Sequence, residues 1–215
     1  MNAAFFDLDG TLTDPKPGIT RSIQYALERL GFPVPTEDAL VWCIGPPLHA
    51  SMKTLVGTDE LAHRAVELYR ERFRDIGLYE NELYAGIDDT LSKVATTGRR
   101  MFVATSKPKI YADRIVEHFS LARYFEHVFG SELDGTRTDK ADLLAYALAE
   151  TNADPTRAIM VGDRSHDVVG AKKNGMTAIG VLYGYGSLDE LTGAGAHHLC
   201  ATHPDVVPHC AASFS

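Results

Sequence analysis

The residues with the clearest chemical potential are two aspartates in the string FFDLDGT, close to the beginning of the chain. Alternate side chains of an extended segment point the same way, so Asp7 and Asp9 are predicted to face one side while Leu8 turns back into the protein. Two carboxylates held side by side repel each other, which favours a cation between or beyond them. Gly10 permits a tight turn, and Thr11 adds a hydroxyl nearby. The string therefore predicts oxygen ligands at a strand end.

Three further polar clusters follow short apolar runs later in the chain. They are Thr105, Ser106 and Lys107 after RMFVA, Lys140 at the start of a helical pattern, and Gly162, Asp163 and Asp167 in VGDRSHD after AIMV. The carboxyl ends of parallel strands share one edge of a sheet, so residues far apart in sequence meet there. These clusters are expected to form one composite site.

Phosphoryl transfer suits this set of residue types. A carboxylate such as Asp7 is ionised at neutral pH and attacks phosphorus without a base, provided that the charge of the phosphoryl oxygens is neutralised. Mg²⁺ held by Asp7 and Asp163 is expected to supply part of that neutralisation. Thr105 and Lys140 complete a cradle for the transferring oxygens. Asp9 is left to protonate the leaving oxygen and later to deprotonate water.

Each cluster alone has an ordinary structural interpretation. Asp7 and Asp9 by themselves fit a turn or a helix cap, Thr105 before a proline fits the start of a helix, and Lys140 fits a solvated surface. The occurrence of all four clusters, in one order, at successive strand ends favours catalysis.

The elements expected to position these residues alternate between apolar runs and helical patterns. The predicted strands are 3–6, 100–104, 127–129, 158–161 and 177–181, and the predicted helices are 87–97, 108–119, 140–150 and 165–174. This alternation predicts an α/β fold, a doubly wound, Rossmann-like parallel sheet with helices on both faces. From Gly184 onward the composition is rich in Gly, Ala and His, and a short edge strand near 198–200 is the one element expected.

Residues 15–82 interrupt the alternation and are predicted to form an all-helical insert. Helical patterns cover 19–30, 37–44 and 59–76, separated by a Pro-rich turn and by the Gly-Pro-Pro break of 45–47. An insert after the first strand is expected over the carboxyl ends of the strands, like a lid. The predicted organisation is a core of residues 1–14 and 83–215 and a cap of 15–82.

Composition restricts the partners. The formal net charge of −8 argues against a nucleic-acid polymer or an anionic membrane. The three cysteines form no CxxC pair, so neither a disulfide framework nor a zinc site is expected, and no apolar run reaches the ~18 residues of a membrane span. A reduced, cytoplasmic protein acting on a small phosphorylated metabolite is predicted.

The ordered motifs resemble those of the haloacid dehalogenase (HAD) superfamily of phosphohydrolases. FFDLDGT, Thr105 within VATSKP, Lys140, and the GDxxxD string that begins at Gly162 match its four motifs. The resemblance implies that Asp7 is the nucleophile and forms an aspartyl-phosphate, and that Asp9 is the general acid and base.

The same resemblance implies the ligands of the metal and of the phosphate. Mg²⁺ would be bound by the Asp7 side chain, the Asp9 main-chain carbonyl and Asp163, with Asp167 holding its waters. The residues expected to contact the phosphate are Gly10, Thr11, Thr105, Ser106 and Lys140.

The insert resembles the C1 cap of the phosphoglycolate phosphatase-like group, and the strings IGPPL, VATSKP and VGDRSHDVVGAKKNGM most resemble its bacterial 5'-nucleotidase branch. His166 stands where phosphoglycolate phosphatases more usually have asparagine. A nucleoside 5'-monophosphate is therefore the predicted substrate, with phosphoglycolate as the alternative. The candidate substrate-contacting residues are Arg21, Ile44, Gly45, Pro46 and His166, although Arg21 also fits a solvated helix face.

Two other functions fit parts of the pattern. A sugar phosphomutase would return the phosphoryl group from Asp7 to its substrate rather than to water. A non-enzymatic phospho-signalling module would combine carboxylates, a hydroxyl and a lysine on a similar sheet, but would carry its aspartate after the third strand, where this chain has Phe129, Gly130 and Ser131.

Overall fold

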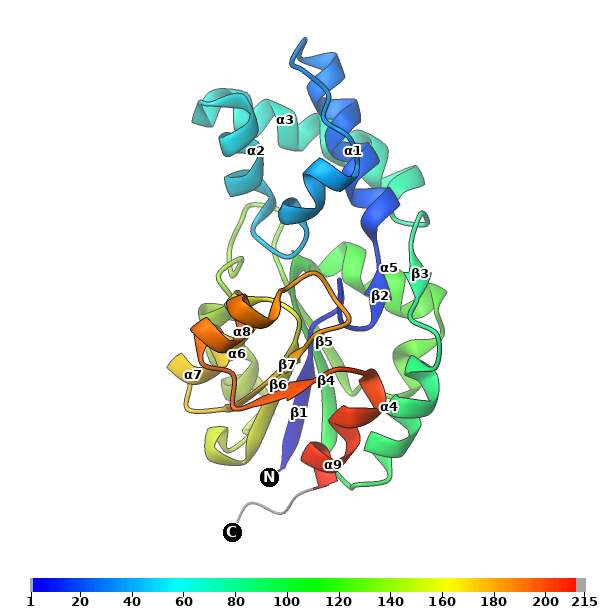
Figure 1. Cartoon of the computed structure of the whole chain (residues 1–215), viewed down its shortest axis with the longest axis vertical. Helices are drawn as coiled ribbons and strands as arrows, with labels where there is room; N and C mark the ends of the chain where they lie inside the picture. Colours follow the sequence, from blue (N-terminus) through cyan, green and yellow to red (C-terminus); the bar gives the residue numbers. More distant parts are fainter. Residues whose placement is uncertain (1, 212–215) are drawn as a thin grey trace. The chain divides into compact units, whose positions relative to one another are not determined.

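A six-stranded parallel sheet forms the centre of the larger part of the chain (Figure 1). The computed structural model describes residues 2–211. The strands, in their order across the sheet, are β5 (His127–Ser131), β4 (Arg100–Pro108), β1 (Ala3–Phe6), β6 (Ala158–Gly162), β7 (Thr177–Val181) and β8 (His198–Cys200). Every neighbouring pair is parallel. The predicted α/β fold is confirmed, and β1, which leads into FFDLDGT, lies between the strands that carry the other motifs.

Helices flank this sheet on both faces, as its crossover connections require. They are α4 (Ile87–Ala95), α5 (Lys109–His118), α6 (Lys140–Thr151), α7 (Ser165–Lys173), α8 (Leu188–Ala194) and α9 (Val206–Ala211). Figure 1 shows α6, α7 and α8 on one side and α4, α5 and α9 on the other. The helices α6 and α7 start directly beside the carboxyl edge, which places their first residues at the predicted site.

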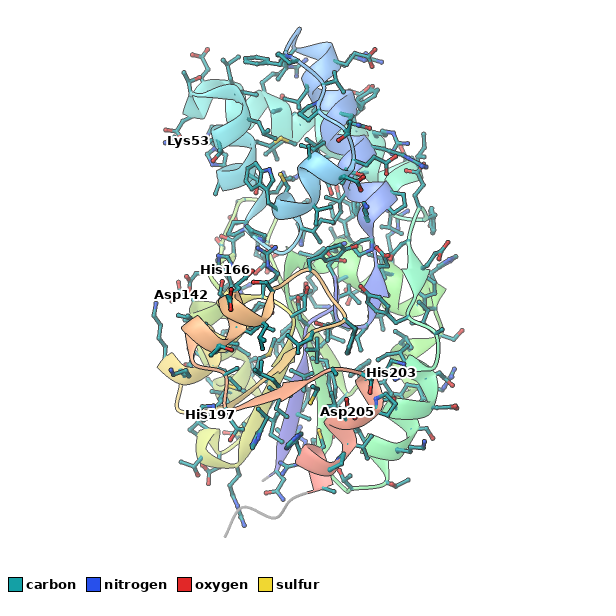
Figure 2. The ribbon with its side chains drawn as sticks, in the orientation of Figure 1. Lys53, Asp142, His166, His197, His203 and Asp205 are labelled. Atoms are coloured by element: carbon teal, nitrogen blue, oxygen red, sulfur yellow. The ribbon has the colours of Figure 1, made fainter. Side chains whose placement is uncertain are left out.

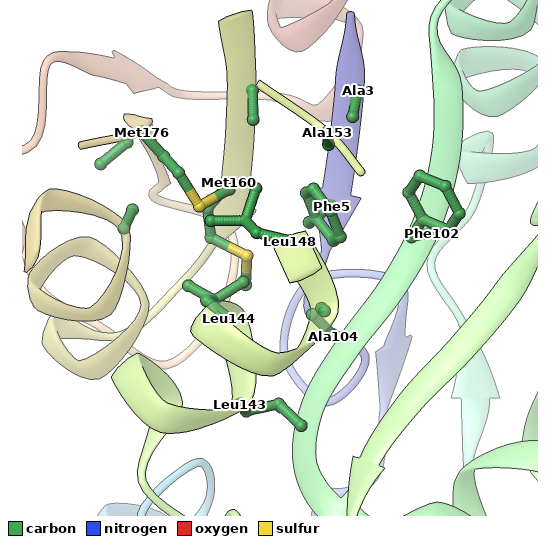
Figure 3. Packing of buried hydrophobic residues seen from close by; sticks show 14 of the residues in the cluster. Ala3, Phe5, Phe102, Ala104, Leu143, Leu144, Leu148, Ala153, Met160 and Met176 are labelled. Atoms are coloured by element: carbon green, nitrogen blue, oxygen red, sulfur yellow. The ribbon is translucent and has the colours of Figure 1, made fainter. Parts of the chain in front are cut away.

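An apolar cluster between the sheet and α6 fixes the direction of β1 (Figure 3). The Phe5 ring stacks on Phe102 of β4 with 5.0 Å between the ring centroids, and both side chains are fully buried. Leu144 and Leu148 of α6 and Met160 of β6 belong to the same cluster. Burial of each such side chain contributes about 1.5–3 kcal/mol. Packing therefore fixes the end of β1, and this in turn fixes where the aspartates that follow it lie.

The expectation for the segment from Gly184 onward was wrong in one respect. The edge strand β8 is present, but two helices, α8 and α9, accompany it. Ser187 caps α8 by accepting a hydrogen bond from the Glu190 N–H, and Gly195 ends that helix with a left-handed φ of 82°. These capping signals were present in the sequence, but the Gly- and Ala-rich composition obscured the short helix between them.

The remaining residues form a second compact unit, whose boundaries fall after Thr13 and after Glu82. It contains α1 (Lys16–Arg29), a 3₁₀ turn at Asp38–Cys43, α2 (Leu48–Val56), α3 (Asp59–Arg72) and a π turn at Phe73–Gly77. The helix α2 was not predicted, and the expected helix at 37–44 is a 3₁₀ turn.

Close backbone contact joins the two ends of this helical unit. A Cβ atom on Gly18 of α1 would lie 2.0 Å from the Gly77 carbonyl oxygen, so only glycine fits there. The short strands β2 (Thr13–Asp14) and β3 (Glu82–Leu83) pair with each other in the two segments that connect the units. Among the helices within residues 2–211, none has the length and apolar character needed to cross a membrane.

Candidate active site

Asp7 lies directly after β1 and extends the pairing of that strand. Its N–H donates to the Val161 carbonyl of β6 at 2.9 Å, so the backbone is held in register where the side chain begins the site. The residue is 4% exposed. A carboxylate at this depth requires a charged partner, because leaving it unpaired would be costly.

Lys140 is that partner. It is the first residue of α6, a helix whose start is fixed by the Asp139 side chain accepting hydrogen bonds from two N–H groups of the first turn. The Lys140 ammonium donates to Asp7 Oδ1 and to the Ala104 carbonyl, both at 2.9 Å, and lies 2.8 Å from Asp167 Oδ1. Burial alone would lower the pKa of Lys140, but the Asp167 and Asp7 carboxylates outweigh burial and raise it. This lysine stays cationic.

Asp163 and Asp167 complete an acidic cluster with Asp7. Oxygen atoms of the three carboxylates lie within 4.8 Å of one another, and all three residues are buried. Burial raises the pKa of Asp163 well above its ordinary value, and repulsion from Asp167 and Asp7 adds to this. Burial also raises the pKa of Asp167 to about 6, although Lys140 opposes the shift. The negative charges of this cluster therefore outnumber its positive charges.

The chemistry of this donor set fits a divalent cation. Four buried aspartates and two lysines meet here, so the formal charge is −4 + 2 = −2, which one divalent ion balances. The donors are hard carboxylate oxygens of the type that Mg²⁺ prefers. Gly162 permits the close approach, since a Cβ on it would lie 2.3 Å from Asp167 Cγ.

Gly10 and Thr11 lie against Asp163, as the predicted convergence requires. The Thr11 hydroxyl donates to Asp163 Oδ1 at 3.3 Å. Gly10 has a φ of 82°, and a Cβ there would lie 2.2 Å from Asp163 Oδ2. Thr11 therefore binds a predicted metal ligand, and Gly10 leaves room for that ligand's carboxylate.

A loop that sequence reasoning missed holds the other side of Asp163. The Tyr185 N–H donates to Asp163 Oδ2 at 2.8 Å. A Cβ on Gly184 would lie 2.3 Å from the Gly10 carbonyl oxygen, so glycine is required for this contact. The string YGYG carries no chemically distinctive side chain, although its glycines directly after a predicted strand were a signal of close backbone approach.

Lys107 is a second residue to which the sequence assigned no role. Its ammonium donates to Asp9 Oδ1 at 2.7 Å, and the two side chains are 6% and 9% exposed. Burial raises the pKa of Asp9, and Lys107 opposes that shift. Asp7 and Asp9 therefore each pair with a lysine of their own, Lys140 for Asp7 and Lys107 for Asp9.

Thr105 and Ser106 lie at the end of β4. Thr105 is buried, and its hydroxyl accepts a hydrogen bond from the Lys107 N–H at 3.3 Å. The Ser106 carbonyl accepts one from the Ser131 hydroxyl of β5 at 2.8 Å. The structure places both residues at the same sheet edge as Lys140.

Of the predicted substrate residues, His166 lies in the sheet-containing unit. It lines a pocket with Lys140, Ser165 and Lys173, and burial, reinforced by Arg164 and Lys140, lowers its pKa. It belongs to α7, and Figure 2 shows it apart from His197 and His203 of the C-terminal segment. Those two histidines have structural partners, the Ala178 N–H for His197 and the Thr90 hydroxyl for His203.

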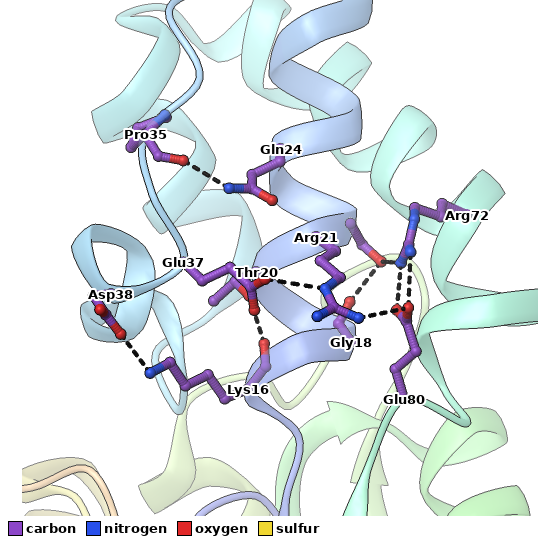
Figure 4. Close-up of polar contacts among 11 residues, drawn as sticks. Lys16, Gly18, Thr20, Arg21, Gln24, Pro35, Glu37, Asp38, Arg72 and Glu80 are labelled. Atoms are coloured by element: carbon purple, nitrogen blue, oxygen red, sulfur yellow. Dashed lines mark hydrogen bonds and ion pairs between the residues drawn. The ribbon is translucent and has the colours of Figure 1, made fainter.

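The other predicted substrate residues belong to the helical unit. Arg21 donates to Glu37 at 3.0 Å and to Glu80 at 3.2 Å within a network of charged residues (Figure 4). Ile44 is fully buried, and Gly45 has a φ of 101° next to Pro46. The structure explains the glycine by its backbone conformation and Arg21 by its two carboxylate partners.

Comparison with known proteins agrees with the fold. The family described as haloacid dehalogenase-like hydrolase matches residues 4–181. A 5'-nucleotidase of Pseudomonas aeruginosa is 49% identical over 91% of this chain and 89% of its own length. The tyrosine-protein kinase PtkA of Mycobacterium tuberculosis is 44% identical over 86% of this chain, a match that spans 63% of that protein.

Among solved structures, a predicted phosphatase from Clostridium acetobutylicum has a TM-score of 0.94 and 41% identity, with 97% of each chain covered. The chain belongs to the haloacid dehalogenase-like hydrolase family, within which it is a phosphatase.

Proposed function

We propose that this protein is a Mg²⁺-dependent phosphomonoester hydrolase that acts through an aspartyl-phosphate on Asp7, most readily on a nucleoside 5'-monophosphate. The observation that carries the proposal is the convergence of Asp7, Lys140, Asp163 and Asp167 on one buried cluster, from the ends of β1 and β6 and the first turns of α6 and α7. No ordinary structural role calls for so many charges in one place, since burial of each is costly.

In the first half of the reaction an Asp7 carboxylate oxygen attacks phosphorus. The new bond joins Asp7 to phosphorus, and the bond from phosphorus to the leaving oxygen breaks. Asp9 donates a proton to that oxygen, so an alcohol departs. Lys140, 2.9 Å from Asp7 Oδ1, holds the nucleophile in place and opposes the negative charge that gathers beside it.

In the second half water attacks the phosphorus of the aspartyl-phosphate. Asp9, now ionised, accepts a proton from the water, and inorganic phosphate and the free Asp7 carboxylate result. Thr105 and Ser106, together with Gly10 and Thr11, are assigned to the phosphoryl oxygens, in accordance with their place at the sheet edge.

The cation would be held by the Asp7 side chain, the Asp9 main-chain carbonyl and Asp163, with Asp167 holding its waters. When bound, Mg²⁺ neutralises the charge of the phosphoryl oxygens. The formal charge of the cluster and its hard oxygen donors support this assignment.

The substrate assignment rests on the resemblance to the 5'-nucleotidase branch and on the relative that is 49% identical. In this proposal the helical insert of residues 15–82 is the cap that selects the substrate. A screen of phosphorylated metabolites for phosphate release tests it. Release from nucleoside 5'-monophosphates in preference to phosphoglycolate is expected. Faster release from phosphoglycolate would instead support assignment as a phosphoglycolate phosphatase.

The relative that is named a tyrosine-protein kinase suggests a second candidate activity. In that case the chain would transfer a phosphoryl group to tyrosine instead of to water. Incubation with ATP and anti-phosphotyrosine detection, beside the phosphate-release assay, separates the two activities. A sugar phosphomutase would isomerise a hexose phosphate with little net phosphate release.

The nucleophile is tested with Asp7→Asn, which keeps the shape of the side chain and removes the attacking carboxylate. We expect phosphate release from p-nitrophenyl phosphate to fall by about 10⁴-fold or more. Asp142→Asn, an exposed carboxylate in the first turn of α6, is the matched control and should retain wild-type rates. Substantial turnover by Asp7→Asn would remove the aspartyl-phosphate from the mechanism.

A further inference from the structure

Lys107 lies in a bulge of β4 next to the strand end that carries Thr105. Thr105 pairs with Gly130 of β5, and Pro108 pairs with the next residue, Ser131, so β4 has two extra residues, the second of which is Lys107. Bulges of this kind redirect side chains beside active sites. The Lys107 side chain therefore does not follow the ordinary alternation of β4.

Contacts from β5 and within β4 hold the backbone of this bulge. The Ser131 hydroxyl donates to the Ser106 carbonyl at 2.8 Å, and the Lys107 N–H donates to the Thr105 hydroxyl at 3.3 Å. Gly130 allows the close packing, since a Cβ on it would lie 2.8 Å from the Lys107 carbonyl oxygen. The base of the lysine side chain is thus fixed from the neighbouring strand.

The other end of the side chain reaches Asp9. The distance of 2.7 Å from the ammonium to Asp9 Oδ1 is that of a charge-assisted hydrogen bond, and both side chains are almost completely buried. Lys140 bonds to Asp7 and not to Asp9. The two lysines therefore serve different aspartates, one the nucleophile and the other the acid and base.

We propose that Lys107 is a positioning residue for proton transfer by Asp9. By holding Asp9 Oδ1, it leaves the second carboxylate oxygen to exchange the proton with the leaving oxygen of the phosphomonoester. This inference rests on the proposed function, in which Asp9 is the general acid. The inference adds the residue that orients this acid.

The leaving oxygen determines how much this orientation matters. When the bond to phosphorus breaks, its electron pair stays on the leaving oxygen, and the Asp9 proton moves to that atom. A p-nitrophenolate ion is stable without the proton, whereas an alkoxide is not. Benzyl phosphate and p-nitrophenyl phosphate both present one aromatic ring, so together they separate proton transfer from substrate binding.

The experiment compares kcat/KM of Lys107→Met for these two substrates. We expect a loss of about 10²-fold for benzyl phosphate and of less than about 5-fold for p-nitrophenyl phosphate. Lys107→Arg, which retains a cationic donor, should recover most of the benzyl phosphate activity. Lys109→Met removes a lysine from the same segment that pairs with exposed Asp113, and it should change neither value.

A double variant tests whether Lys107 acts through Asp9. If it does, Asp9→Asn combined with Lys107→Met should be no slower on benzyl phosphate than Asp9→Asn alone, within about threefold. Lys107→Gln is measured in parallel, so that the comparison stands if the methionine variant unfolds. Thermal melts of every variant report any loss of folded protein.

Equal losses for the two substrates would overturn the inference, because they indicate a structural role or a contact with the phosphate. A double variant whose loss of activity equals the product of the losses in the two single variants would also overturn it. Failure of the proposed function is a different result: the wild type would then release no phosphate from either substrate, or Asp7→Asn would remain active.

Discussion

The ion pairs at the buried acidic cluster and the ion pairs of the helical unit are used in opposite ways. In the sheet-containing unit, the side chains of the Lys140–Asp7 pair are 3% and 6% exposed. In the helical unit, those of the Arg21–Glu37 pair are 45% and 33% exposed. Solvent screens the exposed pair, which contributes at most about 1 kcal/mol. Removing one partner of a buried pair leaves an uncompensated charge and costs about 3–5 kcal/mol.

This difference indicates what each network is for. The buried network retains charges that an apolar core would exclude, and such charges are kept where chemistry needs them. The network of the helical unit is exposed at Arg21 and partly buried at Arg72, and it joins the beginning and end of its fold, since Arg72 and Arg21 both donate to Glu80. The first network is expected to respond to substitution in activity and in stability, and the second in stability alone.

The largest effect is expected from Lys140→Met. This change leaves Asp7 and Asp167 without their ammonium partner in a buried site, so the free energy of unfolding without added metal should fall by about 3 kcal/mol or more. Phosphate release should fall by about 10²–10³-fold, the typical loss when one charge-stabilising donor is removed. Urea unfolding and steady-state kinetics measure the two changes.

Lys53→Met is the matched control for this comparison. Lys53 forms a 2.7 Å pair with Asp59 in the helical unit, with side chains 49% and 60% exposed. Its removal should change the free energy of unfolding by less than about 1 kcal/mol. A similar loss of stability in both variants would mean that the two networks do not differ as described.

A smaller effect is expected from the pH dependence of Mg²⁺ binding. The folded-state pKa of Asp167 is about 6, above its ordinary value of 3.8. Between these values the folded protein binds more protons than the unfolded chain, so the stability of the metal-free protein should fall as pH rises from about 4 to 6. Mg²⁺ requires the ionised form, so its stabilising effect should be larger at pH 7.5 than at pH 5.

At a Mg²⁺ concentration 100 times the dissociation constant, the increase in the free energy of unfolding should be about 2.7 kcal/mol at pH 7.5. Urea unfolding at the two pH values, with Mg²⁺ or with EDTA, measures it. Equal increments at pH 5 and pH 7.5 would contradict the assignment of the metal to this cluster.

The smallest effect is expected from Arg21→Ala in the helical unit. Because Arg21 is exposed and shares one of its two carboxylate partners, Glu80, with Arg72, its loss should have little effect on the free energy of unfolding. We expect KM for a nucleoside 5'-monophosphate to change by less than about threefold, because the Arg21 guanidinium already binds Glu37 and Glu80. Arg29→Ala, on the same helix, is the control. A tenfold rise in KM for Arg21→Ala, without such a rise for Arg29→Ala, would support the predicted contact between Arg21 and the substrate.

Much of the fold and of the site was predictable because it depends on local patterns. The strands 3–6 and 177–181 coincide with β1 and β7, since an apolar run bounded by turn residues identifies a buried strand. The site residues follow such runs directly, and the geometry of a parallel sheet brings strand ends together. Short elements without a strong pattern, such as α2 and α8, escaped prediction.

Lys107 and the loop at Tyr185 show the limit of this reasoning. The partner of Lys107 depends on a two-residue bulge in β4, which the string VATSKP does not reveal. Tyr185 acts through its backbone N–H, a donor that every residue type except proline carries.

The sequence by itself determined the parallel α/β sheet and the chemical class of the site, because periodicity and residue type specify strand ends and what they carry. Only the tertiary structure decided which lysine serves which aspartate, Lys140 for Asp7 and Lys107 for Asp9. The physical reason is that ion pairing depends on separations of a few ångströms between atoms. Those separations are set by packing and by a local shift of strand register, neither of which the order of residues displays.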